Sequence, residues 1–452
     1  MVSADNLNYD VLELIFAWLS GHDLAAVSQV SRSFLAGAIP RLYKTINFSL
    51  KQAKTYPRTM SPFAVVLAHP HLAIHVRRID IRAVPSLHSQ LKTQAHPEFL
   101  RDCLAAVAAS KNLISFTCTP FHILPSFITP LQNKERLQTL RINASLATDQ
   151  AEKLLHLTGL KSLTLEHASW IVVDSLPKWA RSLQSTLTQL TLYMVADFNS
   201  CILDSTLPHL PKLRGLHIIG CPGVDHVDIL RATVHTPLLE SLAISTSEYR
   251  QYSQLPNSLV PLQHLRHLAI DSESHSHLAT TTIPALWSSI FESLHLWAAP
   301  LTSVALRPTT RLSCDGLIKE LIDMHGSTLK FLSLLNCTVS IESMADIAEK
   351  CTTLERLALP IADVRDVTGF RLALRKSPSI HTLVDVGDAH TTHGPRVSLT
   401  TEPVRHMMEE IPSLHKVVSE NRHWTGQTGS DGVRVTLDRK KPGTSSHWFM
   451  PP

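Results

Sequence analysis

A pattern of apolar side chains, apolar-x-x-apolar-x-apolar, returns along most of this chain. Its clear copies begin at Leu137, Leu160, Leu187, Leu213, Leu239, Leu265, Phe291, Leu329 and Leu354. From Leu160 onward the starts are 27, 26, 26, 26, 26, 38 and 25 residues apart. Because one such unit cannot bury its own apolar face, neighbouring units must stack on one another. We therefore expect an array in which each copy supplies one short strand.

Weaker copies of the pattern extend the array at both ends. They begin at Val76, Leu113, Ile380 and Leu414, which gives about 13 units in all. Between the strands, stretches such as Leu317 to Met324 have helical spacing, so the array is predicted to be mixed α/β. The long step between Phe291 and Leu329 predicts a loop or insertion.

The first fifty residues follow a different pattern. Apolar residues recur there at helical spacing in three short segments; Gly21-His22 ends the first, and Pro40 breaks or restarts the third. Asn8 is a candidate N-cap for the first helix. Three helices of this length cannot bury so much apolar surface among themselves. The surplus must contact the rest of the chain or a partner; a helical cap that only seals the array is the simpler alternative.

The order of residues in this segment resembles the F-box family. The matching positions are Leu7, Leu12, Ile15-Phe16, Leu19, Asp23-Leu24, Val30-Ser31-Arg32, Phe34 and Leu42-Tyr43. Asn8 stands where the family usually has proline, and Phe34 where it usually has tryptophan. The resemblance implies that this segment binds Skp1. The residues expected to form its core and its Skp1-binding face are Leu7, Leu12, Ile15, Phe16, Leu19, Leu24, Val30 and Phe34.

Two repeats resemble the cysteine-containing leucine-rich repeats, in which Cys221, Cys337 and Cys351 would be buried. The whole chain is thus similar to F-box–leucine-rich-repeat proteins, in particular their fungal sets. That resemblance implies an α/β fold, with a three-helix F-box followed by a horseshoe solenoid of about 13 repeats. The expected domains are an F-box at 1–48, a connector at 49–75, the solenoid at 76–420 and a terminal hairpin and tail at 421–452. The final residues are predicted to be disordered.

The resemblance implies a substrate-recognition adaptor of an SCF-type ubiquitin ligase, which binds Skp1, through it a cullin, and an unknown target protein. Such a chain performs no catalysis itself. Two alternatives stay open: a scaffold outside any ligase, and a receptor in which a small molecule completes the target surface. Alternate strand residues should line the concave face and contact the target. These are Arg78, Arg82, Arg141, Glu166, Tyr193, His217, His267, Asp271, His295 and Trp297.

Composition excludes several other classes. Lysine and arginine number 42 against 38 acidic residues, a balance that does not favour nucleic-acid binding. Seven cysteines without a CxxC pair indicate a reducing compartment, and no signal peptide or membrane span is predicted. The 26 histidines are scattered without an HExxH motif, and GxxxxGK[ST] and GxSxG are also absent. We expect no metal, no cofactor and no enzymatic activity. We expect the chain to act in the cytoplasm or the nucleus.

Overall fold

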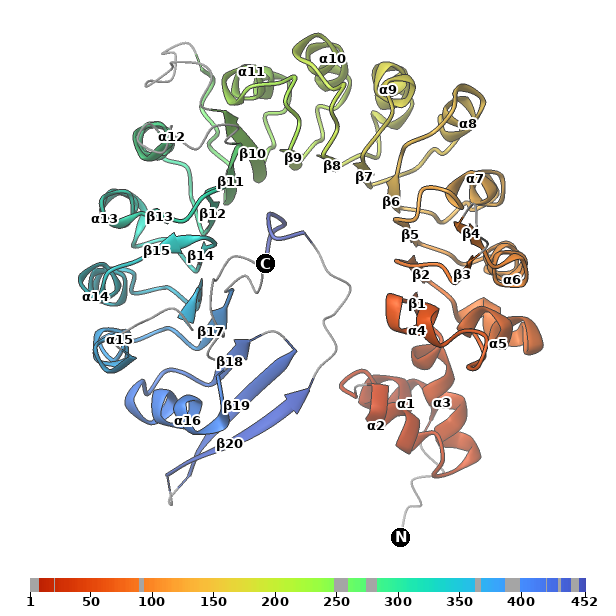
Figure 1. The fold of residues 1–452 in the computed structure, drawn as a ribbon, viewed down its shortest axis with the longest axis horizontal. Helices are drawn as coiled ribbons and strands as arrows, with labels where there is room; N and C mark the ends of the chain where they lie inside the picture. Colours follow the sequence, from red (N-terminus) through yellow and green to blue (C-terminus); the bar gives the residue numbers. More distant parts are fainter. Residues whose placement is uncertain are drawn as a thin grey trace. The chain divides into compact units, whose positions relative to one another are not determined.

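The computed structural model describes residues 8–19, 21–88, 93–247, 259–273, 283–361, 367–386, 399–419, 421–429, 432–439 and 447–452. The chain divides into two compact units, Met1–Phe198 and Asn199–Pro452. Each unit combines a parallel sheet with helical crossovers, so the fold is mixed α/β (Figure 1).

Unit 1 begins with three helices and continues into a parallel sheet. The helices are α1 (Tyr9–Phe16), α2 (Gly21–Val27) and α3 (Arg32–Leu42). The strands lie in chain order: β1 (Thr45–Phe48), β2 (Arg78–Ile81), β5 (Ser115–Cys118), β6 (Thr139–Asn143), β7 (Ser162–Glu166) and β8 (Gln189–Tyr193). A small antiparallel pair, β3 (Ser86–His88) and β4 (Thr93–Ala95), lies apart from this sheet.

Unit 2 repeats the same arrangement and ends in a hairpin. Its parallel strands are β9 (Gly215–Ile219), β10 (Ser241–Ser247), β11 (His267–Glu273), β12 (Ser303–Arg307), β14 (Phe331–Leu334), β16 (Arg356–Leu359), β17 (Thr382–Asp385) and β18 (Lys416–Ser419). Strands β19 (Arg422–Gly429) and β20 (Gly432–Arg439) pair antiparallel, in the region where a hairpin is predicted. A second small pair is formed by β13 (Leu312–Ser313) and β15 (Cys337–Thr338).

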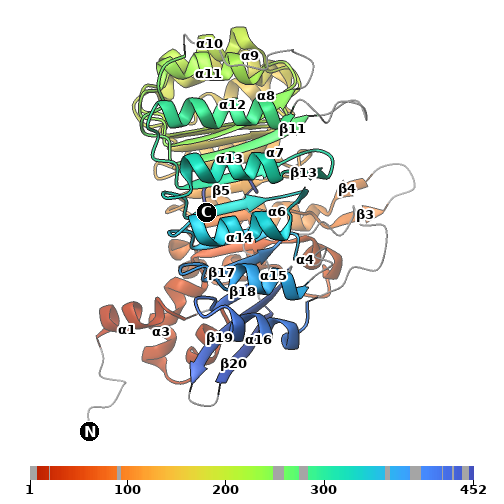
Figure 2. The same ribbon diagram turned by 90° about the vertical axis from the view of Figure 1, so that its left-hand side faces the viewer.

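Helices cover one face of the sheet in each unit (Figures 1 and 2). In unit 1 they are α4 (Leu50–Thr55), α5 (Pro62–Ala68), η2 (Pro70–His75), α6 (Pro97–Ala109), α7 (Leu124–Gln132), α8 (Thr148–Leu154) and α9 (Trp170–Leu183). In unit 2 they are α10 (Ser200–Thr206), η3 (Leu207–His209), α11 (His226–Ala232), η4 (Thr233–His235), α12 (Ile283–Leu296), α13 (Asp315–His325), α14 (Ile341–Lys350), α15 (Val367–Leu374) and α16 (Thr401–Glu410). We call the opposite face of the sheet the inner face.

The register explains why the sequence repeats. The fourth residue of each motif pairs with its counterpart in the next strand, as in Leu216, Leu242 and Leu268. These side chains are almost completely buried, and so are those two positions further on, such as Ile244 and Ile270. Each strand therefore contributes the same two apolar side chains to a continuous core between sheet and helices.

One helix shows how the local sequence supports the crossovers. The Ser340 hydroxyl accepts a hydrogen bond from the Ser343 backbone amide and caps the start of α14. Met344 and Ile347 are buried on the side of α14 that packs against the core. Cys351, which is also buried, is the C-cap of the helix. Cys221 and Cys337 are buried as well, as the repeat pattern predicts.

The strand predicted at Phe291 is wrong. Residues Phe291 to Leu296 are the last turns of helix α12, which buries Trp287, Ile290 and Phe291 at helical spacing. The strand is β12, where Leu301, Val304 and Leu306 carry the motif instead. The long step in the repeat therefore lies between β11 and β12. A spacing of three residues fits both a helix and the motif, so the motif alone did not separate them.

The start of the sheet also differs from the expected domain boundaries. Residues 45–48 form β1, which pairs in parallel with β2, so they belong to the sheet and not to the helical segment. Residues 49–75 contain α4, α5 and η2 and form the crossover between these two strands. The other motif copies, weaker ones included, lie on strands β2, β5 to β11, β14 and β16 to β18.

Candidate functional site

Helices α1, α2 and α3 enclose a small core of their own. Its buried residues are Leu12, Phe16, Leu24 and Ala38, with Leu19, Val27, Phe34 and Leu42 packed against them. The rings of Phe16 and Phe34 lie 5.5 Å apart, so phenylalanine fills the position at which the family usually has tryptophan. Asn8 occupies the N-cap position of α1, but its side chain makes no capping hydrogen bond.

Close contact between α1 and α3 depends on Gly37. A β-carbon at that position would lie 3.0 Å from Cε2 of Phe16 and 3.1 Å from Cβ of Leu12. The guanidinium of Arg41 also donates a hydrogen bond of 2.9 Å to the carbonyl of Ala17, which ties α3 to the end of α1. The helical segment thus has a well-packed core of its own. Its exposed apolar residues are therefore not explained by poor packing of the helices.

A second set of apolar side chains on this segment points into solvent. Val11, Leu14, Ile15 and Trp18, which we call the α1 face, are between 41% and 90% exposed. Their spacing along α1 and the turn after it places them on one side of the helix. Val30 and Leu35 are exposed elsewhere on the segment. Exposed apolar side chains gathered on one helix side make this face a candidate partner-binding site.

The predicted Skp1-contact residues therefore separate into two groups. Leu12, Phe16 and Leu24 are buried, Leu19 and Phe34 are packed against them, and only Ile15 and Val30 are exposed. Leu7 lies outside the described residues. Sequence reasoning missed Leu14 and Trp18, the most exposed members of the α1 face. Their position opposite the Leu12–Phe16 side of the helical period was the signal that could have identified them.

In unit 1, two of the four charged residues predicted to bind a target bind each other. Arg141 Nε on β6 donates to Glu166 Oε1 on β7 at 2.6 Å, and both side chains are largely buried. Arg82 forms an ion pair with Asp80, with Nε 2.6 Å from Oδ1. Arg78 on β2 is exposed. Tyr193 on β8 is half-buried, with its ring centroid 6.4 Å from that of His167.

In unit 2, the two predicted histidines of the inner face are buried. His217 on β9 is hydrogen-bonded through Nε2 to Ser241 Oγ at 2.8 Å. His267 on β11 is hydrogen-bonded through Nδ1 to Ser303 Oγ at 2.9 Å. Burial lowers the pKa of His217 to about 3 and that of His267 to about 4. Both rings are therefore neutral near pH 7.

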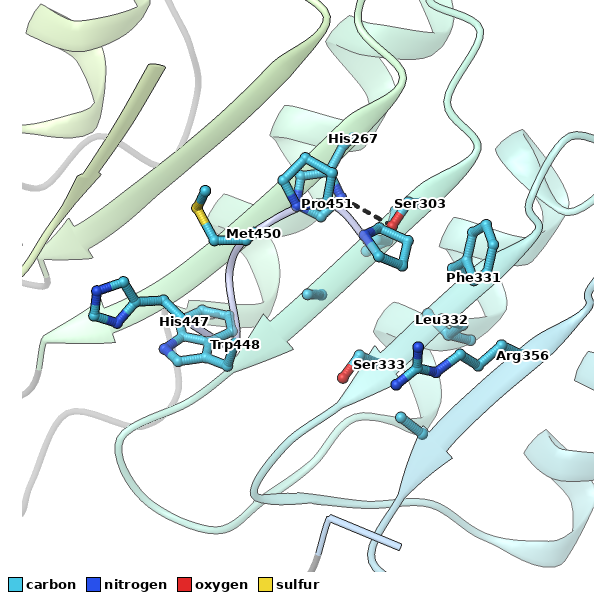
Figure 3. A pocket seen from close by; sticks show the side chains of 14 residues that line it. His267, Ser303, Phe331, Leu332, Ser333, Arg356, His447, Trp448, Met450 and Pro451 are labelled. Carbon is cyan, nitrogen blue, oxygen red and sulfur yellow. Dashed lines mark hydrogen bonds between the residues drawn. The ribbon is translucent and has the colours of Figure 1, made fainter. Parts of the chain in front are cut away.

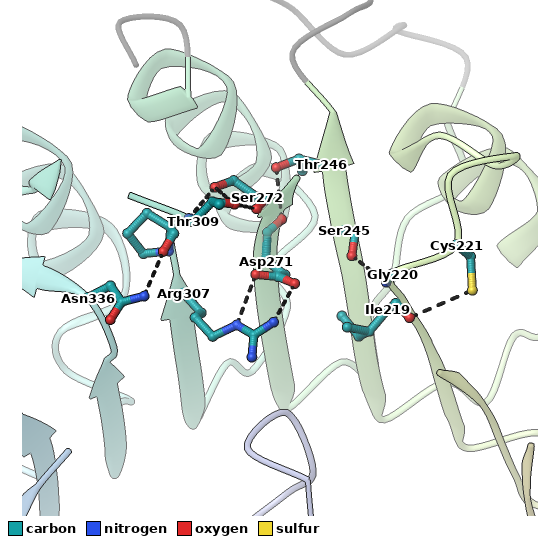
Figure 4. A network of polar contacts seen from close by, with 11 residues as sticks. Ile219, Gly220, Cys221, Ser245, Thr246, Asp271, Ser272, Arg307, Thr309 and Asn336 are labelled. Atoms are coloured by element: carbon teal, nitrogen blue, oxygen red, sulfur yellow. Dashed lines mark hydrogen bonds and ion pairs between the residues drawn. The ribbon is translucent and has the colours of Figure 1, made fainter. Parts of the chain in front are cut away.

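Asp271 on β11 forms a two-pronged ion pair with Arg307 on β12. Nε and Nη2 of Arg307 donate to the two carboxylate oxygens at 3.1 and 2.9 Å. Burial raises the pKa of Asp271 even though Arg307 opposes the shift. Polar contacts continue along the ends of the neighbouring strands (Figure 4), where Thr246 donates to the Asp271 carbonyl and Ser245 accepts from the Gly220 amide.

The C-terminal segment, residues 447–452, lies on this inner face. The ring of Phe449 is completely buried, and its carbonyl is hydrogen-bonded to Nε2 of His267 at 2.9 Å. The guanidinium of Arg307 lies 4.7 Å from the ring centre of Trp448. The prediction that the final residues are disordered is wrong for this segment. Its adjacent Trp448, Phe449 and Met450 were the available signal, because such side chains are rarely all solvated.

A cavity of about 350 Å³ opens beside the C-terminal segment (Figure 3). Strands β11, β12, β14 and β16 supply one wall, through residues that include His267, Ser303, Phe331 and Arg356. The other wall is the C-terminal segment itself. This volume lies within the range of small-molecule sites and of pockets that accept one or two side chains.

The structure places two predicted target contacts elsewhere. His295 lies on helix α12 and not on a strand, and Trp297 follows the end of that helix. Neither residue therefore belongs to a strand whose side chains line the inner face. The segment predicted as a strand around them is a helix. The His295 ring instead lies 5.6 Å from that of His325 on α13.

The residues that the structure describes contain no group of three or more histidine, cysteine or acidic side chains able to hold a metal ion. Helices within the described ranges are all too short or too polar to cross a membrane. His275, His277, His390 and His393 lie outside those ranges.

Comparison with known proteins identifies the helical segment. A family model described as F-box domain matches residues 5–36. The chain therefore carries an F-box domain at this place, and such domains generally bind Skp1 and serve as adaptors in SCF-type ubiquitin ligases. No curated protein matches this sequence.

Among solved structures, the complex of Rad7 and Elc1 in yeast is similar to this chain. The similarity covers 86% of this chain and 92% of that one, with 17% sequence identity and a TM-score of 0.44.

Proposed function

We propose that this chain is the substrate-recognition adaptor of an SCF-type ubiquitin ligase. Its F-box binds Skp1, and through Skp1 a cullin, while the inner face of the sheet binds the target protein. The observation that carries the proposal is the α1 face: four large apolar side chains lie exposed beside a filled core, within the residues that match an F-box. The adaptor performs no chemistry and acts by raising the local concentration of its target near the ligase.

The repeating sheet fits the second half of this proposal. We propose that residues 45–419 form a leucine-rich-repeat solenoid, which would have about 13 repeats by the sequence pattern. Aligned leucines in successive strands support this proposal, and so does the single helical crossover that joins most pairs of successive strands. An extended row of strands offers side chains to a protein surface and not only to a small metabolite. On this proposal the chain acts in the cytoplasm or the nucleus.

Co-purification with Skp1 tests the F-box half. Leu14→Asp and Trp18→Asp each place a charge on the α1 face without touching the buried core. Hot-spot residues of an interface contribute on the order of 2 kcal/mol or more, so each change should weaken Skp1 binding by about thirtyfold or more. Leu50→Asp is the matched control, since Leu50 is equally apolar and 60% exposed but lies on α4. Undiminished binding by both α1 variants would contradict the assignment.

The same experiment separates the rival functions. A scaffold outside the ligase would retain Skp1 but recruit neither cullin nor a ubiquitylated target. The small-molecule receptor has one observation in its favour, the cavity of about 350 Å³ beside the C-terminal segment. A ligand that raises the melting temperature of the wild-type chain, and not that of a Phe331→Ala variant in the cavity wall, would support the receptor.

A further inference from the structure

The C-terminal segment is held on the inner face of unit 2 as a bound peptide would be. Three kinds of contact hold it. His267 is hydrogen-bonded to a main-chain carbonyl, Arg307 stacks on an indole ring, and the buried Phe449 ring lies 6.0 Å from that of His217. A main-chain contact combined with aromatic anchors is how proteins commonly bind short peptides.

The strands beneath the segment leave room for it. At the middle of each strand the paired residues are small: Ala243, Ala269, Ala305, Ser333 and Ala358 stand in matching register on β10, β11, β12, β14 and β16. In unit 1 the corresponding position on β6 carries Arg141. A run of small side chains lets a second chain approach the sheet closely, and His217 and Arg307 stand beside this run as its larger neighbours.

The segment does not use every feature of this surface. The indole Nε1 of Trp448 is buried and has no hydrogen-bond partner among the described residues. Arg356 lines the cavity beside Pro451 and Pro452, and the described part of the chain offers it no acidic partner. A buried donor without an acceptor lowers the affinity of its own segment. A peptide that lacks this unsatisfied donor and carries an acidic group facing Arg356 would bind the same surface more tightly than the segment does.

We propose that the inner face of β9 to β16 is a binding site for a peptide with two adjacent aromatic residues followed by an acidic residue, and that residues 447–452 occupy it in the absence of that peptide. That the peptide belongs to a ligase target rests on the proposed function above. The site itself does not. The C-terminal segment acts as a built-in competitor, and its tether gives it an effective concentration in the millimolar range.

Peptide binding in trans tests the site. The probe is a fluorescently labelled hexapeptide with the sequence of residues 447–452, and its anisotropy is measured with two full-length chains. One is wild type, and the other carries Trp448→Ala and Phe449→Ala to release its own segment. The variant should bind the peptide at least about tenfold more tightly than the wild type, because the tethered competitor is lost. Equal affinity for both chains would overturn the proposal.

Matched changes show where the peptide binds. Adding Arg307→Gln to the variant should weaken binding, since a cation–π contact is worth roughly two- to thirtyfold in affinity. A peptide with Pro452→Glu should bind more tightly than the parent, and only while Arg356 is present. Phe121→Ala removes an exposed ring from unit 1 and should leave the affinity of the wild-type chain unchanged. Binding that is insensitive to Arg307 would show that the peptide sits elsewhere.

Phe449 is buried, so the double variant could unfold. In that case the Trp448→Ala chain, which keeps Phe449, replaces it, and the peptide affinity should rise over wild type by about the two- to thirtyfold that the stacking contributes. No rise in a folded Trp448→Ala chain would contradict the proposal. Skp1 binding is measured on the same chains and should not change. Lost peptide binding with Skp1 retained would refute this site and leave the adaptor function standing.

Discussion

His267 Nε2 donates a hydrogen bond of 2.9 Å to the carbonyl oxygen of Phe449, across 182 residues of sequence. A carbonyl oxygen only accepts, so Nε2 carries the proton. The ring is neutral because burial lowers its pKa to about 4, and Nδ1 therefore accepts from the Ser303 hydroxyl at 2.9 Å. One buried ring thus joins β11, β12 and the C-terminal segment.

Removing this ring should release the segment. His267→Leu fills a similar volume but cannot donate to Phe449, and an unsatisfied buried carbonyl costs about 1–3 kcal/mol. We expect faster amide hydrogen exchange in residues 447–452, with exchange in α13 and α14 unchanged. His381→Leu, at an exposed histidine of the same unit, is the control and should leave all these rates as they are.

The two buried histidines should make the chain less stable in acid. Above pH 6.5 both rings are neutral whether the chain is folded or not, so they add no pH dependence. Below pH 6.5 the unfolded chain takes up protons that folded His217 and His267 exclude until their pKa values of about 3 and 4. Stability therefore falls with pH, by about 1.4 kcal/mol per unit for each ring.

Urea titrations at pH 6.5 and pH 5 measure this loss, which should reach about 1.6 kcal/mol for each ring over that interval. A chain with His217→Gln and His267→Gln should show a shallower dependence. An unchanged slope in that variant would assign the acid sensitivity to groups other than these two rings.

Arg307 should be costly to remove on its own. Arg307→Leu leaves the carboxylate of Asp271 buried without its partner, which we expect to destabilise the chain by about 3–5 kcal/mol. Arg307→Leu combined with Asp271→Leu should recover most of that loss, because the unpaired charge is gone. Arg214→Leu breaks the exposed pair with Glu240 and should cost at most about 1 kcal/mol. Urea titration compares all three; equal losses for Arg307→Leu and Arg214→Leu would contradict the argument.

Gly37 should tolerate no larger residue. Gly37→Val pushes side-chain atoms into the Phe16 ring and Leu12, and overpacking of this kind typically costs about 1–3 kcal/mol. Gly316→Ala on α13 meets no atom within 4 Å and replaces a flexible residue in a helix, so it should be neutral or stabilising by up to about 1 kcal/mol. Thermal unfolding of the two variants measures the difference. Skp1 binding should fall only for the Gly37 variant, because the proposed Skp1-binding face lies on α1, which Gly37 packs against.

The sequence alone determined the repeating part of the fold. A strand requires only that buried side chains alternate over a few residues, so the motifs at Leu163, Leu216 or Leu357 marked their strands directly. The helical spacing of Leu12, Phe16 and Leu24 likewise predicted the F-box core. The motif predicted a strand wrongly at Phe291. Leu294 and Leu296 fit a helix and a strand equally well, and only the burial of the neighbouring Trp287 on the same helix side distinguishes the two.

Only the tertiary structure decided which side chains are available to a partner. Exposure depends on what packs from elsewhere in the chain, which no local pattern contains. The sequence offered His217, His267 and Asp271 as contacts for a target, but Phe449 and Arg307 cover or pair them. It placed Leu12 and Ile15 together among the residues of the core and Skp1-binding face, and packing of α1 against α3 buried the first and left the second exposed beside Leu14 and Trp18.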